Sequence, residues 1–417
     1  MDASDELRVL SLFSGCGGMD IGFEGGFICH RKSIPPQNNW IQEEIDSHWV
    51  RLKPTRFRTV FANDILKEAQ TAWWQYMGTH GHKADEYHLE SIVDLVHRHQ
   101  AGESVFPSGI DVVTGGFPCQ DFSLSGKRLG FKSNKDHKGK LREGDEPSEE
   151  TRGMLYYWMK QVIDITKPKI FIAENVKGLI NLGDVKTIIQ QDFAQADDGG
   201  YIVLDPKVLQ AANHGVPQSR ERVIFIGIRK SALLPEALKA LQASTVPEAY
   251  DPYPQPTHAF SVTGSHLLPP VTCRDVFVDL KEPDLTDDPS QQYYSKAKFM
   301  GPHCQGQREI DLDKIAPTIR SEHHGNIEFR RLDIEHGGCQ MVELAVGLKE
   351  RRLTPRECAL IQTFSPDHIF VSFNQNNRFK LSASAAYKVI GNAIPPILAY
   401  HIANRIQAVW HVIFKNQ

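Results

Sequence analysis

The chain has 417 residues, 41% of them hydrophobic and 24% charged, and its 47 basic and 51 acidic residues give a net charge of −4. At about 150 residues per domain, this length predicts two to three domains with a sizeable buried core. The acidic balance excludes a protein that binds nucleic acid through global positive charge. A nucleic-acid partner would therefore need a local basic patch.

Membrane and export signals are not apparent in the sequence. No apolar run approaches the ~18 residues that a membrane helix needs, and the first residues carry acids where a signal peptide has a basic region. The cysteines are odd in number and none has CxxC spacing, which favours reduced thiols over a disulfide framework. We expect a cytoplasmic protein without a membrane partner. The seven cysteines are at positions 16, 29, 119, 273, 304, 339 and 358.

Short β-branched runs alternate with helix-length segments over the first 230 residues. This alternation predicts an α/β fold with a mostly parallel sheet and helices on both faces. The expected strands cover 7–13, 58–64, 110–116, 169–176 and 222–228, and the expected helices cover 65–77, 86–99 and 152–166.

The pattern changes near residue 243. Six prolines fall between Pro247 and Pro270, which indicates a connector, and the chain stays irregular to about residue 349. This predicts a smaller domain without β–α alternation. After Pro395–Pro396, apolar residues recur at helical spacing to the end of the chain, so a C-terminal helix is expected.

The first strand leads into LFSGCGGMDIGFE (12–24). A strand, a glycine-rich turn and a helix are typical of a nucleotide-like ligand site in open α/β sheets, although packing glycines in a tight turn explain the pattern equally well. The second strand ends at Asp64, where an acid either bonds ribose hydroxyls or caps the next helix. The long gap between the turn and Asp64 predicts an insertion within 25–58.

Reactive side chains follow the next strands. GGFPCQDFS (115–123) places Cys119 at a strand's carboxyl end, as a nucleophile or as a buried structural thiol. AENV (173–176) places Glu174 and Asn175 at the same edge, where a protonated carboxyl group could donate to a ring nitrogen or the pair could cap a helix.

The segment GVPQSRERVIFIG (215–227) alternates Gln218, Arg220 and Arg222 as it enters a strand. Period-two spacing points all three side chains to one face. Two guanidinium groups on one face suit phosphate or carbonyl recognition, and a solvated strand end is the alternative.

With RRLTPRECALIQTF (351–364) and YKVIGNAIPP (387–396), these four blocks in this order resemble the DNA (cytosine-5)-methyltransferases of bacterial restriction–modification systems. The resemblance covers about 1–230 and 350–417. It implies a Rossmann-like, S-adenosylmethionine-dependent methyltransferase fold. Segments 1–235 and 350–417 would then form the catalytic domain, with 236–349 as a smaller, irregular target recognition domain.

The resemblance also implies roles for single residues. Asp64, where the family more often has Glu, would bond the ribose of S-adenosylmethionine, and Ile65 would pack on its adenine. LESIVDL (89–95) lacks the Gly-Asp that many members show, so the residue that reads the adenine stays open. The other implied cofactor-binding residues are Phe13, Gly15, Gly17, Gly18, Pro118 and Asn392.

In the implied chemistry, the thiolate of Cys119 attacks ring carbon 6 of a flipped-out cytosine. Glu174 would be protonated and bonded to ring nitrogen 3, and Arg222 would hold the base's carbonyl, with Arg220 and Gln218 supporting the loop. The segment 126–142 carries seven Lys or Arg residues and resembles the family's loop that closes over the substrate.

The expected partners are double-stranded DNA and, functionally, a restriction endonuclease, and the protein is expected to be a monomer. An RNA cytosine methyltransferase on the same fold and a non-catalytic binding protein are the alternatives. A zinc site in the smaller domain lacks finger spacing, so no metal is expected. Its candidate ligands would be Cys304, His323, His324, His336 and Cys339.

Overall fold

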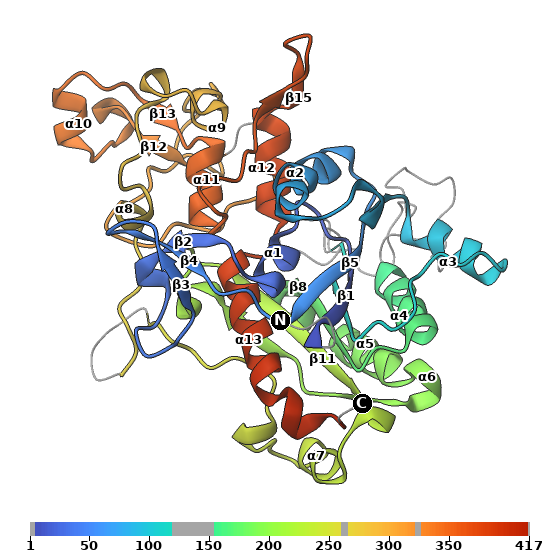
Figure 1. The fold of residues 1–417 in the computed structure, drawn as a ribbon. Helices are drawn as coiled ribbons and strands as arrows, with labels where there is room; N and C mark the ends of the chain where they lie inside the picture. The colour runs from blue at the N-terminus through green and yellow to red at the C-terminus, as the bar shows by residue number, and fades with distance from the viewer. Residues whose placement is uncertain (1–4, 119–153, 260–265, 322–326, 416–417) are drawn as a thin grey trace.

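The computed structural model describes residues 5–118, 154–259, 266–321 and 327–415. An eight-stranded sheet lies at its centre, with the order β10–β11–β8–β7–β1–β5–β6 and with β9 paired to β11 (Figure 1). The strands are β1 (Leu7–Leu12), β5 (Phe57–Asp64), β6 (Tyr87–Leu89), β7 (Val112–Gly116), β8 (Ile170–Val176), β9 (Tyr201–Val203), β10 (Lys207–Gln210) and β11 (Glu221–Arg229).

The five strands from β6 to β8 along the sheet run parallel, whereas β11 pairs with β8 in the antiparallel direction. The side chains of the central strands β1, β7 and β8 are buried on both faces, which is why the sequence shows near-continuous apolar runs there in place of alternation. The predicted α/β class and mostly parallel sheet are confirmed, and each of the five predicted strands is present within about two residues of its expected bounds.

Helices cover both faces of the sheet (Figure 1). Two separate apolar clusters, one on each face, join these helices to the strands. One face carries α1 (Gly18–Glu24), α2 (Lys67–Met77), α12 (Ala383–Asn392) and α13 (Pro396–Ile413), and the other carries α3 (Ile92–Gln100), α4 (Leu155–Thr166) and α5 (Val185–Ala194).

One expected helix is shorter than predicted. Residues 87–89 of the predicted helix 86–99 form the edge strand β6, and α3 begins only at Ile92. Tyr87 buries its ring while its backbone pairs with β5, and the Ser91 side chain caps α3 by accepting from the Val93 N–H. Tertiary pairing at the sheet edge therefore overrides the local helical pattern.

The predicted insertion is a small antiparallel sheet. It consists of β2 (Ile28–His30), β3 (Ile41–Glu44) and β4 (Trp49–Leu52), with β4 in the middle. Trp40 packs edge-on against Tyr400 and His401, with ring centroids 5.3 and 4.8 Å away. The insertion is thereby fixed to α13.

The chain before the predicted connector and the first part of the connector both pack onto the catalytic part. α7 (Pro235–Leu241), just before the connector, buries Ala237 and Leu241 in the apolar cluster that includes α13. Within the connector, the Tyr253 hydroxyl donates to the Ile224 carbonyl at 2.9 Å. The irregular part of the chain therefore begins after about residue 258.

That smaller part contains short elements at the upper left of Figure 1. Its centre holds an ion network in which the fully buried Arg331 bonds Glu282 and Glu343, both at 2.7 Å, and Arg351 bonds Glu282 and Glu357 at 2.9 Å. Paired charges are thus buried beside apolar side chains such as Ile310 and Phe329, so the buried positions of this part do not follow a regular apolar pattern. The elements are α8 (Cys273–Val276), α9 (Pro289–Gln292), β12 (Phe329–Arg331), α10 (Met341–Ala345), β13 (Arg351–Arg352) and the adjoining α11 (Pro355–Ile361).

Among the helices in these described ranges, none has the length and apolar character needed to cross a membrane.

Candidate active site

The glycine-rich turn reverses the chain between β1 and α1. Phe13, Gly15 and Gly17 have φ values of 53°, 56° and 87°, and a non-glycine residue in that region costs about 1–3 kcal/mol. A Cβ on Gly18 would lie 2.2 Å from the Ile394 carbonyl oxygen. The turn is therefore a strained, closely packed backbone segment in direct contact with residues 387–396, which we call the C-terminal block.

Asp64 lies beside this turn, at the carboxyl end of β5. Its carboxylate accepts from the Gly15 N–H at 3.1 Å and the Leu66 N–H at 2.9 Å, and burial raises its pKa above the usual value. The Tyr87 hydroxyl donates to the Gly15 carbonyl at 3.1 Å. Two neighbouring strands and the turn are thus locked together around one acidic group.

Exposed aliphatic side chains follow the same two strands. Ile65 is 44% exposed and Leu89 is 41% exposed, although both come at the ends of buried strands. The Asn63 amide group fixes the corner after β6 by donating to the carbonyls of His88 and Glu90. Leu89 was not predicted as a site residue. What marks it as a candidate is its exposed aliphatic side chain at the end of a strand, and this exposure can be seen only in the folded structure.

A second unpredicted group lies beneath the turn. Asp20 is buried and accepts from the Ser11 hydroxyl at 2.5 Å and from the Trp73 indole N–H at 2.8 Å. The Ser14 hydroxyl extends this series of hydrogen bonds by donating to the Ser11 hydroxyl at 2.9 Å. Burial raises the pKa of Asp20 to about 6, and these bonds tie the turn to α1 and α2.

The ends of β7, β8 and β11 bring two predicted residues together. Glu174 is 8% exposed, and its Oε1 lies 2.8 Å from Nε of Arg222. Burial raises the pKa of Glu174, while the charges of Arg222 and Arg220 oppose the shift. A Cβ on Gly116 would lie 2.9 Å from Glu174 Oε2, so the carboxyl group directly faces the end of β7.

Asn175 holds the chain that leads to the predicted nucleophile. Its amide group donates to the Phe117 carbonyl at 3.1 Å, and its side-chain oxygen accepts from the Val176 N–H at 2.8 Å. Pro118, which follows, is half-buried. Cys119 and the basic segment 126–142 lie outside the described residues.

Gln218 and Arg220 bind backbone and neighbouring side chains of the protein itself. Gln218 is fully buried, accepts from the Ile319 N–H at 2.9 Å and donates to the Gln362 side chain at 2.7 Å. Arg220, also fully buried, donates to the carbonyls of Ile319, Gly391 and Ala393 at 2.8–3.1 Å. Arg220 therefore positions the C-terminal block 387–396, whereas Gln218 reaches the block 351–364 through Gln362. Asn392 is exposed and lies between Gly391 and Ala393, two of the three residues whose carbonyls Arg220 binds.

The sequence and the fold are similar to those of known methyltransferases. The family model of the C-5 cytosine-specific DNA methylases matches residues 7–408. The chain belongs to this family. It is 31% identical to the type II methyltransferase M.BsuRI of Bacillus subtilis, over 98% of this chain and 81% of that protein. It is 30% identical to M.BspRI of Lysinibacillus sphaericus, over 97% and 82%.

Solved structures show the same fold at lower identity. The Dnmt2 methyltransferase of S. pombe superimposes with a TM-score of 0.53 at 14% identity, over 96% of this chain and 98% of that one. The methyltransferase EhMeth of Entamoeba histolytica gives 0.54 at 12%, over 97% and 98%. The expected family, fold and enzyme class are confirmed: the chain is a DNA (cytosine-5)-methyltransferase of the bacterial restriction–modification type.

Within the described residues, the candidate zinc ligands of the smaller part do not come together. Cys304 and Cys339 are exposed and unbonded to each other, and His336 groups instead with Asp333 and Glu350. His336 already bonds Glu350 at 2.5 Å. His323 and His324 lie outside the described residues.

Proposed function

We propose that this methyltransferase transfers a methyl group from S-adenosylmethionine to ring carbon 5 of a cytosine within a specific duplex DNA sequence. The observation that carries the proposal is the buried Glu174–Arg222 pair, 2.8 Å apart, beside the backbone that Asn175 anchors just before Cys119. A carboxyl group whose pKa burial raises, next to a guanidinium group, suits a base that must be held and protonated.

The proposed chemistry begins with addition of the Cys119 thiolate to ring carbon 6. Glu174 donates its proton to ring nitrogen 3, so the added electron pair is stabilised and carbon 5 becomes nucleophilic. Arg222 holds the base's carbonyl oxygen. Carbon 5 gains the methyl group and loses its proton, and departure of the thiolate restores the aromatic ring. The base must leave the duplex for these groups to reach it.

The residues of the turn fit S-adenosylmethionine, which supplies an electrophilic methyl group when bound. Asp64 would accept from the ribose hydroxyls, and Ile65 and Leu89 would cover the adenine ring with apolar surface. The left-handed turn lets backbone and ligand approach closely. We assign the remaining contacts to Phe13, Gly15, Gly17, Gly18, Pro118 and Asn392.

The proposal extends to the cell. Segment 236–349 would read the DNA sequence, its first residues serving as the connector packed on the sheet, and the basic segment 126–142 would close over the substrate. Methylation would protect the cytoplasmic DNA from a partner restriction endonuclease, with the enzyme acting as a monomer.

A mechanism-based trap tests the proposal. Duplex DNA that carries fluorine at ring carbon 5 of the target cytosine still accepts the thiolate and the methyl group, but fluorine cannot leave as a cation. The enzyme should stay covalently bound on a denaturing gel, only with S-adenosylmethionine present, and neither Cys119→Ala nor Glu174→Gln should trap at the wild-type rate. No band under any condition would overturn the covalent mechanism, and trapping on RNA alone would favour the RNA alternative.

A further inference from the structure

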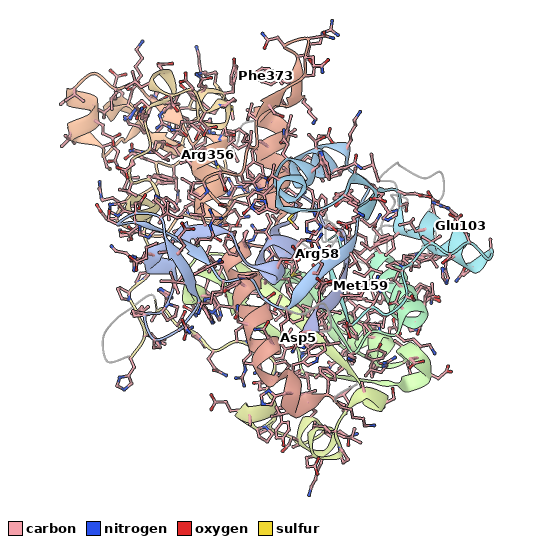
Figure 2. All side chains as sticks on the ribbon, viewed as in Figure 1. Asp5, Arg58, Glu103, Met159, Arg356 and Phe373 are labelled. Carbon is pink, nitrogen blue, oxygen red and sulfur yellow. The ribbon has the colours of Figure 1, made fainter. Side chains whose placement is uncertain are left out.

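A β-hairpin projects beyond the sheet directly before α12 (Figure 1). It consists of β14 (Ser372–Phe373) and β15 (Phe379–Leu381), and its tip is exposed. Phe373, on the hairpin in Figure 2, stacks on Phe379 with 4.7 Å between the ring centroids, and Tyr293 of the smaller part meets each ring at 5.3 Å. This aromatic contact holds the hairpin against the segment that follows α9.

The two joined segments carry positive charge alone. Residues 289–300 and 372–381 contain four basic residues and no acid, in a chain whose acids outnumber its bases. Within the part of the chain that the structure describes, none of the four pairs with a carboxylate. Asp288, the acid next to the first segment, is itself paired with Arg356 at 2.6 Å. We call these exposed side chains the basic rim: Lys296, Lys298, Arg378 and Lys380.

The backbone beneath the basic rim is fixed from inside. The buried Arg352 donates to the carbonyls of Ala297 at 2.7 Å and Lys298 at 3.2 Å. The Ser295 N–H donates to the hydroxyl of Tyr387, which belongs to α12. Because α12 ends at Asn392, the basic rim is tied to the helix that leads into the candidate cofactor site.

We propose that the basic rim binds backbone phosphates of the duplex that flanks the target cytosine. This inference rests on the proposed function. Duplex DNA carries about one charge per 1.7 Å of its axis, so it suits an array of cations whose backbone is already ordered. The hairpin tip adds the uncharged amide groups of Asn374, Gln375, Asn376 and Asn377, which can donate to phosphate oxygens as well.

The test measures how the affinity for DNA depends on salt. Anisotropy of a labelled duplex, with and without the target sequence, gives the dissociation constant of the full-length protein between about 50 and 200 mM salt. Arg378→Gln with Lys380→Gln should make the negative slope of log affinity against log salt shallower by about 1.8, since each lost phosphate contact contributes about 0.9 to its magnitude. Both duplexes should lose affinity by the same factor. Lys296→Gln with Lys298→Gln should behave in the same way.

Lys230→Gln with Lys239→Gln is the matched control, because these lysines are exposed near α7, at the opposite end of the molecule. Its slope should equal the wild-type slope. A rim variant with the wild-type slope, or one that weakens only the target duplex, would overturn the phosphate assignment. Covalent trapping by the wild type separates this outcome from failure of the proposed function, since an enzyme that traps DNA yet shows no slope change contradicts the basic rim alone.

Discussion

At the scale of single residues, the position of the Glu174 carboxyl group in the candidate active site depends on the missing side chain of Gly116. Gly116 has no side chain, and a Cβ added there would lie only 2.9 Å from Glu174 Oε2, so the carboxyl group would have to move. Its neighbour Gly115 points the other way, and a Cβ there would lie 2.9 Å from the sulfur of Met159, a flexible side chain on α4 (Figure 2). Substitutions of these two neighbouring glycines therefore distinguish an effect on the candidate active site, at Gly116, from an effect on packing, at Gly115.

Gly116→Ala should therefore lower kcat by about a hundredfold, because a shift of about 1 Å in a catalytic group can cost that much. Circular dichroism and S-adenosylmethionine affinity should stay close to wild type. Gly115→Ala should lower the unfolding temperature and leave kcat within a few-fold. Equal kcat losses in the two variants would contradict the assigned position of Glu174.

The charge of Arg222 controls the proton of Glu174. Burial raises the pKa of Glu174 and Arg222 pulls it down, so Arg222→Gln should raise that pKa further. The proposed mechanism needs the protonated form, which is lost as pH rises through the pKa. The alkaline limb of the kcat/KM profile should therefore move to higher pH in Arg222→Gln, while the maximum falls. A limb that moves to lower pH would show that Glu174 does not act as the acid.

At the scale of elements, Arg220 joins β11 to the C-terminal block. It binds the carbonyls of three residues that lie 99 to 173 positions away in sequence. The Ile394 carbonyl, which follows the end of α12, packs so closely on Gly18 that a Cβ there would lie 2.2 Å from its oxygen. By holding the end of α12, the Arg220 bonds therefore also fix this contact with the glycine turn. Loss of this one side chain should loosen the end of α12, which carries Asn392 of the candidate cofactor site.

Arg220→Met should lower the free energy of unfolding by about 3 kcal/mol, since buried carbonyls lose charged donors. It should also weaken S-adenosylmethionine binding at least tenfold by calorimetry. Arg405→Met is the matched control: Arg405 also donates to backbone carbonyls, those of Glu248 and Asp251, but far from the turn. That variant should lose stability and keep its affinity, and an equal loss of affinity in both would refute a specific role for Arg220.

At the scale of the whole molecule, buried histidines make stability depend on pH. Burial lowers the pKa of His214 to about 4 and that of His368 to about 3, and it lowers that of His401 far below the usual 6.5. His401 and His214 lie 5.1 Å apart, centroid to centroid, where α13 meets the chain before β11. The folded protein keeps these rings neutral, whereas the unfolded chain takes up protons below about pH 6.5.

The stability that these histidines supply should be complete above pH 6.5 and fall as pH drops from 6.5 toward 4, by up to about 3 kcal/mol for each such histidine. Thermal unfolding at pH 7.5 and pH 5 measures the loss. His401→Phe should reduce the difference between the unfolding temperatures at pH 7.5 and pH 5. His411→Phe, at an exposed position on the same helix, should leave it unchanged. A wild type that is more stable at pH 5 would contradict this origin.

Much of this protein is determined by its sequence alone. The strand runs, the glycine turn and the order of six short blocks are local patterns, so they predict the sheet, the family and the positions of Asp64, Glu174 and Arg222 without a structure. Side-chain periodicity and turn chemistry act over a few residues, which is why such features survive in a single sequence.

The tertiary structure decided the rest. Strand β6 replaced part of a predicted helix, and β11 took the antiparallel direction. The partners of Arg220, the ion network around Arg331 and the buried Asp20 beneath the turn join segments that are remote in sequence or hidden from any periodic pattern. The physical reason is that a buried polar group must find its partners wherever the folded chain supplies them, and no local pattern records which distant carbonyl or carboxylate that will be.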